Sequence, residues 1–70
     1  MLPQSSQKVV DYWWPVVEAY TKIQMAKNLP RPKLIEVMTN YLETKTFLVR
    51  ERKAVMLKVM ELINAVDSGR

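Results

Sequence analysis

The second half of this chain contains no residue that forces a helix to stop. All four prolines lie at or before Pro32, and the single glycine is Gly69. Proline and glycine are the strongest helix breakers, so the stretch between these two positions is free to form helix. Apolar residues there recur at helical spacing and keep their phase from Leu34 to Val66. The pattern predicts one continuous helix over about 32–66.

A second interpretation divides this long helix in two. Thr44, Lys45 and Thr46 form a stretch of weak helix propensity near its middle. A break there would leave two shorter helices after the first one. The alternative fold is therefore a monomeric three-helix bundle with a break near 44–46.

The start of the first helix depends on Pro15. A helix that began at Ser6 would hold this proline in its interior, where proline removes a hydrogen bond and kinks the helix. If Asp11 is instead the N-cap, Pro15 falls in the first turn, where a missing N–H has little effect. We therefore predict a first helix over about 11–28 and leave residues 6–10 unassigned.

Further prolines mark the connector between the two helices. Asn28 tolerates the left-handed conformation of helix ends, and Pro30 and Pro32 each push the preceding residue out of the α region. Pro32 also suits the first position of a helix. A link this short, over 28–32, predicts an antiparallel helical hairpin.

The composition is that of one small folding domain. Hydrophobic residues make up 49% of the chain and charged residues 26%, which is too apolar for a disordered segment. Seventy residues leave room for a single domain over 1–70. We expect residues 1–5 to be a disordered lead-in and residues 67–70 a frayed tail.

The two predicted helices differ in length, and this mismatch predicts an interface. A helix of 18 residues spans roughly 27 Å and one of 35 residues roughly 52 Å, so the far end of the long helix has no neighbour within the chain. Covering this end with a second copy gives an all-α homodimer, a four-helix bundle made of two hairpins. Trp14, at the edge of the apolar stripe of the first helix, is a further interface candidate. The predicted partner or dimer interface consists of Trp14, Val55, Met56, Val59, Met60, Leu62, Ile63 and Val66.

Residue types that carry most enzymatic and metal chemistry are missing. The chain has no cysteine and no histidine, so it lacks thiolate ligands, imidazole ligands and the usual general base at neutral pH. No glycine-rich loop is present. We therefore expect no catalytic residues, no metal and no cofactor. The favoured function is a non-enzymatic protein–protein interaction module, a small adaptor, assembly factor, regulator or inhibitor that binds another protein chain, itself or a second protein.

A basic segment supports an alternative function. The formal net charge is +4, and five cations fall within two heptads. Three of them, Lys45, Arg52 and Lys53, follow the apolar seam of the long helix, and the other two lie on its polar side, so they do not form one face. The alternative function is a small nucleic-acid-binding regulator. The residues that would contact nucleic acid, or an acidic protein partner, are Lys45, Arg50, Arg52, Lys53 and Lys58.

Membrane association is not indicated by the sequence. No stretch approaches the roughly 20 apolar residues of a membrane span, and the first ten residues lack the pattern of a signal peptide. With cysteine also absent, the expected location is the cytoplasm.

Overall fold

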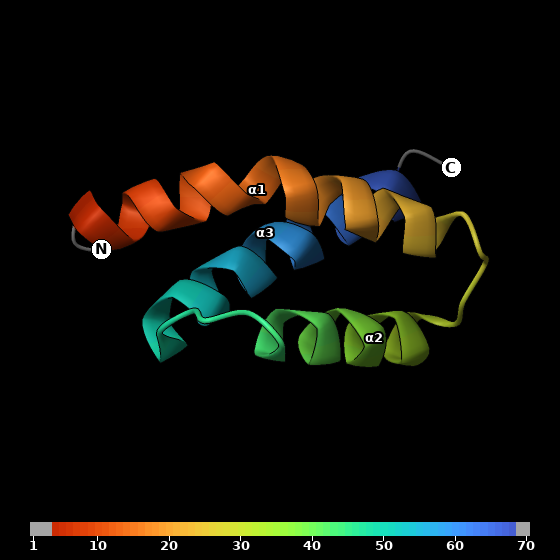
Figure 1. The fold of residues 1–70 in the computed structure, drawn as a ribbon. Helices are drawn as coiled ribbons and strands as arrows, with labels where there is room; N and C mark the ends of the chain where they lie inside the picture. Colours follow the sequence, from red (N-terminus) through yellow and green to blue (C-terminus); the bar gives the residue numbers. More distant parts are fainter. Residues whose placement is uncertain (1–3, 69–70) are drawn as a thin grey trace.

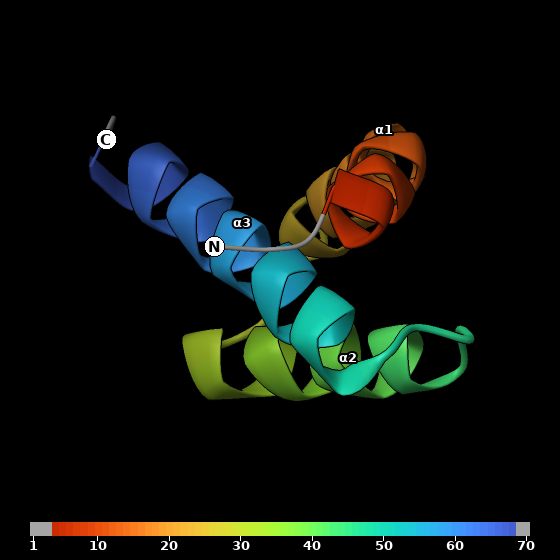
Figure 2. The same ribbon diagram turned by 90° about the vertical axis from the view of Figure 1, so that its left-hand side faces the viewer.

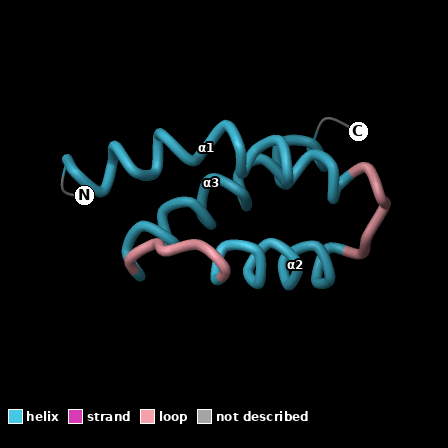
Figure 3. Tube along the Cα trace, viewed as in Figure 1, coloured by secondary structure: helices cyan, strands magenta, loops and turns pink. Residues whose placement is uncertain are grey.

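The protein is an all-α fold with three helices in the part of the chain that the structure describes (Figure 1). The computed structural model describes the backbone of residues 4–68 and the side chains of residues 4–66. The helices are α1 (Gln4–Met25), α2 (Arg31–Glu43) and α3 (Val49–Ser68). Figure 3 shows the two loops that join them, and no strand occurs within these limits.

Parts of the predicted disordered ends are helical. Gln4 and Ser5 belong to α1, and residues 67–68 belong to the last turn of α3, so the predictions of a lead-in over 1–5 and a tail over 67–70 are wrong for these residues. The remainder of both predictions, residues 1–3 and 69–70, lies outside the described residues.

α1 begins earlier than its proline predicts. It starts at Gln4, so Pro15 lies in the helix interior and the prediction of an N-cap at Asp11 is wrong. The first turns are held by tertiary contacts, because Val10 is buried and the Ser6 hydroxyl accepts a hydrogen bond of 3.0 Å from Arg50 Nε of α3. These contacts offset the hydrogen bond that Pro15 removes.

The end of α1 and the start of α2 follow the predicted local rules. Asn28 has a φ of 58°, the left-handed conformation that asparagine tolerates better than most residues. α2 begins with Pro32 in its first turn, and Leu34 donates a backbone hydrogen bond of 2.9 Å to the carbonyl of Pro30. α1 and α2 run in opposite directions, as the short link predicts (Figure 1). α1 ends at Met25, three residues before the predicted boundary.

The prediction of a continuous helix over 32–66 is wrong, and the three-helix alternative with a break near 44–46 is confirmed. α2 ends at Glu43 and α3 begins at Val49. The Thr44 hydroxyl donates a hydrogen bond of 2.6 Å to the carbonyl of Tyr41, and the backbone N–H of Thr44 donates to the same oxygen. These local bonds compete with continuation of the helix, which is the usual reason that threonine favours helix ends.

A buried carboxylate starts α3. Glu51 is only 5% exposed, and its Oε1 accepts a hydrogen bond of 2.9 Å from the backbone N–H of Leu48. A glutamate at the third position of a helix that bonds back to the residue before the helix is one half of a capping box. This bond satisfies a donor that the helix itself leaves unpaired and fixes the direction in which α3 leaves the loop.

The turn at 44–48 lets one chain cover its own apolar face. α3 packs against both other helices, while α1 and α2 contact each other least. Figure 2 shows α3 crossing between them. The exposed area is 4853 Å², close to the roughly 4,500 Å² expected for a compact monomer of 8.2 kDa. The core consists of Val10, Val17, Leu34, Met38, Leu42, Val55, Val59 and Ile63.

The interior proline gives a first prediction. Pro15 is exposed, so replacing it with alanine removes no core packing and restores a helical hydrogen bond. We expect Pro15→Ala to raise the free energy of unfolding by about 2 kcal/mol in urea titrations. The control is Asn40→Ala on the exposed face of α2, which should gain no more than about 0.5 kcal/mol. Equal effects of both substitutions would contradict the placement of Pro15 inside α1.

The cap of α3 gives a second prediction. Glu51→Ala removes the acceptor of the Leu48 N–H and should lower the free energy of unfolding by about 1–2 kcal/mol. Glu61, an exposed glutamate of the same helix, is the matched control, and Glu61→Ala should change stability by less than about 0.5 kcal/mol. Thermal unfolding of both variants measures the difference, and a stability loss confined to Glu61→Ala would show that Glu51 does not cap the helix.

Candidate interaction surface

Helix α1 carries polar residues on its buried face. Three of its five buried residues are polar, although a buried helix face is normally apolar. Val10 and Val17 are the apolar members. The buried set is Ser6, Val10, Val17, Thr21 and Gln24.

The opposite side of α1 is apolar and exposed. Tyr12 is 77% exposed, Val16 50% and Ile23 58%. Together with half-buried Val9 and exposed Ala19 and Ala26, these residues follow alternating spacings of three and four. Residues at such spacings line one side of a helix and are typical of a coiled-coil seam. We call this set, Val9, Tyr12, Val16, Ala19, Ile23 and Ala26, the outer strip.

The orientation of α1 is fixed by contacts on its buried face. The Thr21 hydroxyl donates a hydrogen bond of 2.8 Å to the carbonyl of Val17 and lies 3.7 Å from the sulfur of Met38. Ser6 holds Arg50 as described above. Among the described residues, no buried side-chain nitrogen or oxygen lacks a hydrogen-bond partner. Rotating α1 to hide the outer strip would break the hydrogen bond between Ser6 and Arg50, separate Thr21 from Met38, and expose the core valines.

Aromatic rings close the gap between α1 and the end of α2. Tyr20 and Tyr41 stack with ring centroids 3.8 Å apart, and Trp13 meets Phe47 edge-on at 6.1 Å. Tyr12 contacts Trp13 edge-on at 5.7 Å. Tyr12 thus joins this aromatic group at one edge while most of its surface remains in solvent.

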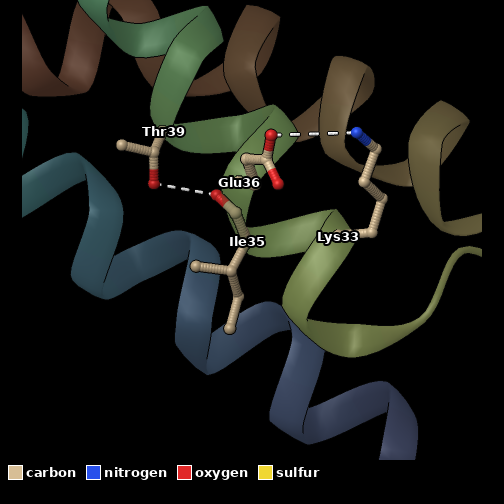
Figure 4. A network of polar contacts seen from close by, with 4 residues as sticks. All are labelled: Lys33, Ile35, Glu36 and Thr39. Atoms are coloured by element: carbon tan, nitrogen blue, oxygen red, sulfur yellow. Dashed lines mark hydrogen bonds and ion pairs between the residues drawn. The ribbon is translucent and has the colours of Figure 1, made fainter.

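The outer surface of α2 differs from that of α1. Lys33 and Glu36 form an exposed ion pair of 3.8 Å, and the Thr39 hydroxyl donates a hydrogen bond of 2.8 Å to the carbonyl of Ile35 (Figure 4). These contacts stay within α2. An exposed pair of this kind contributes at most a few tenths of a kcal/mol. The surface is that of an ordinary solvated helix.

Three of the seven predicted interface residues on the third helix are buried inside the molecule. Val55, Val59 and Ile63 are 0–2% exposed and belong to the core, so they cannot meet a partner in this fold. The reason given for that interface, an apolar end without an intrachain neighbour, is therefore wrong. The other predicted residues, Trp14, Met56, Met60 and Leu62, are half-buried, and Val66 is 36% exposed.

The predicted basic contacts divide between two sides of the molecule. Lys45, Arg50 and Lys58 face α1, where Lys45 Nζ lies 5.6 Å from the Trp13 ring and Lys58 Nζ lies 5.2 Å from the Trp14 ring. Lys45 also lies 4.7 Å from the Tyr41 ring. Such contacts of cations with aromatic faces are attractive. These three cations therefore take part in the packing of the fold.

Arg52 and Lys53 lie on another side, in an open pocket between α2 and α3. Its volume is about 130 Å³, and Thr39, Leu42 and Met56 complete its lining. Sites for drug-sized ligands occupy about 300–1,000 Å³, so this hollow holds at most one small group. The five cations do not form the single positive face that a phosphate backbone requires.

The part of the chain that the structure describes holds no group of three or more acidic side chains placed to bind a metal ion. None of its helices combines the length and the apolar character needed to cross a bilayer.

Comparison of the chain with protein-family models, with curated proteins and with solved structures finds no match.

The outer strip was missed by reasoning from the sequence. Its members from Val9 to Ile23 have heptad spacing that is visible in the sequence. The sequence was interpreted with one apolar stripe on the first helix, which placed Val9, Val16 and Ile23 toward the core, whereas the structure leaves Val16 and Ile23 exposed.

Neighbouring valines test which side of α1 is buried. Val17 is 0% exposed and Val16 is 50% exposed. We expect Val17→Ala to lower the free energy of unfolding by about 2 kcal/mol, from lost burial and the cavity left behind. Val16→Ala should change it by less than about 0.5 kcal/mol at low micromolar concentration, because little packing is lost and alanine favours helix. A larger loss for Val16→Ala would mean that α1 is rotated.

Proposed function

We propose that this chain is a non-enzymatic protein–protein interaction module that binds another chain through the outer strip of α1. It acts as a small adaptor, assembly factor, regulator or inhibitor. The observation that carries the proposal is the inverted arrangement of α1, which buries Thr21 and Gln24 and leaves Tyr12, Val16 and Ile23 in solvent. A contiguous exposed apolar patch of this kind is typical of an interaction site.

The strip is suited to a helical partner. Alternating spacings of three and four residues present one straight row of side chains, which a second helix can meet along its length. Tyrosine is also a favoured binding hot spot, because it buries a large area and keeps a polar tip. Tyr12, at 77%, is the most exposed large hydrophobic residue of the described part.

Energetics indicate a modest affinity from the strip alone. Burying the exposed parts of Tyr12, Val16 and Ile23 gains roughly 3–6 kcal/mol. Association itself costs at least about 4 kcal/mol in lost translation and rotation. Contacts beside the strip must therefore add to the affinity, and the charged residues along α1 are placed to supply them.

The non-enzymatic part of the proposal rests on composition. Without histidine and cysteine the chain lacks the commonest acid–base and nucleophilic groups. The pocket between α2 and α3 has apolar walls and two cations, and none of its lining residues is a carboxylate. Binding a partner through the exposed apolar side chains of the outer strip requires none of these catalytic groups.

Site-specific photo-crosslinking tests the proposed surface. A photoreactive residue at exposed Lys22, beside the strip, should form adducts with a partner in cells that express the chain. The same residue at exposed Asn40 of α2 is the matched control and should form none. Adding Ile23→Glu to the Lys22 version should remove the adducts, because a charge in an apolar contact is unfavourable.

Adducts are identified by mass spectrometry of the linked peptides. Adducts of equal yield at both positions, or adducts that persist with Ile23→Glu, would contradict binding through the outer strip.

A further inference from the structure

We infer that the occupant of the outer strip is a second copy of this chain, docked through α1 with the two helices antiparallel. This inference rests on the proposed function, since it names the partner of the same surface. The dimer contact then lies on α1, and the core residues of α3 remain buried within their own chain.

The outer strip is complementary to itself in an antiparallel pair. When Val16 of one copy lies level with Ala19 of the other, Tyr12 lies level with Ile23 and Val9 with Ala26. Two of these levels combine valine with alanine, and the third packs Tyr12 beside Ile23, so the facing rows of the two helices can interdigitate. The six positions span about 25 Å, from Val9 in α1 to Ala26 directly after its end, where the N–H of Ala26 still donates a helical hydrogen bond of 3.0 Å to the carbonyl of Lys22.

Charges beside the strip also favour this arrangement. Asp11 and Lys22 are both exposed and lie on the same flank of the strip, eleven positions apart. In the antiparallel pair, Asp11 of each copy comes within about 3 Å along the axis of the level of Lys22 of the other. Two symmetric ion pairs result. In a parallel pair the same flank of the two copies lies on opposite sides of the contact, so neither Asp11 nor Lys22 would gain an opposite charge from the other.

The fold permits this contact without rearrangement. In Figure 2, where α1 is seen almost end-on, α2 and α3 both lie to one side of it. The outer strip lies on the side away from the buried set of α1. Two complete three-helix units can therefore meet through α1 alone, and the contact is reversible.

Mass in solution is the first test. Light scattering of the purified chain over micromolar to millimolar concentration should show a rise from 8.2 kDa toward twice that mass. Ile23→Glu should lower the association constant by about tenfold or more. Asn40→Glu adds the same charge to an exposed position of α2 and should leave it unchanged. A single mass of 8.2 kDa at all concentrations would overturn the inference.

A charge exchange tests the ion pairs. Asp11→Lys and Lys22→Asp should each weaken self-association, because each variant brings like charges together twice. Mixing the two variants should restore association, since every pair across the mixed dimer then joins opposite charges. Both variants change exposed residues and should remain folded by circular dichroism. Failure of the mixture to associate more tightly than either variant alone would overturn the proposed register.

Disulfide trapping tests the direction of the helices. The chain has no cysteine of its own, so Val9→Cys and Ala26→Cys introduce unique thiols. A mixture of the two variants should form a mixed disulfide under mild oxidation. Val9→Cys alone should not, because its two thiols lie about 25 Å apart and a disulfide needs Cα atoms within about 7 Å. Efficient linkage of Val9→Cys to itself would show a parallel pair and overturn the inference.

These results separate the inference from the proposed function. If the purified chain is monomeric but Lys22 crosslinks to a different protein in an Ile23-dependent manner, the second-copy inference fails and the proposed function stands. If neither self-association nor an Ile23-dependent adduct is found, both fail.

Discussion

The fold depends on the turn between α2 and α3. A continuous helix over the predicted range would span roughly 52 Å, whereas the longest dimension of the molecule is 35 Å. By turning at residues 44–48, the chain packs the apolar face of α3 against the face of α2 that carries Met38 and Leu42. Hydrogen bonds hold the turn on both sides, from the Thr44 hydroxyl at the end of α2 and to the Glu51 carboxylate at the start of α3.

The same turn determines which surface remains for a partner. Because α3 is covered by its own chain, its core residues Val55 and Val59 no longer need a second molecule. α1 leaves Tyr12, Val16 and Ile23 exposed, because its buried face is the one that carries Val10 and Val17. The sequence predicted a dimer interface on the helix that is now α3. We propose instead that two copies associate through the outer strip of α1. The fold does not depend on this association, because the proposed contact would join two molecules that are each already folded.

Local rules predicted much of the fold from the sequence. The all-α class, the antiparallel course of α1 and α2 and the left-handed Asn28 follow from residue types and short spacings. Apolar periodicity also identified side chains of the second half of the chain that must be buried. It cannot show whether the backbone turns between two such side chains, as it does at 44–48. The rule for Pro15 failed because burial of Val10 and the contact of Ser6 with Arg50, 44 positions away, outweigh a lost helical bond. Interactions across such separations are not visible in a local pattern, and for the same reason the outer strip went unrecognised.

One distance tests the central claim that the chain folds back at 44–48. The guanidinium of Arg31 donates a hydrogen bond to the side-chain oxygen of Asn64, so the start of α2 lies beside the last turns of α3. In a continuous helix these positions would be about 50 Å apart. Spin labels on cysteines at 31 and 64, with the labelled chain diluted in unlabelled protein so that only distances within one molecule count, should give a separation less than half of that. A distribution centred near 50 Å would contradict the account.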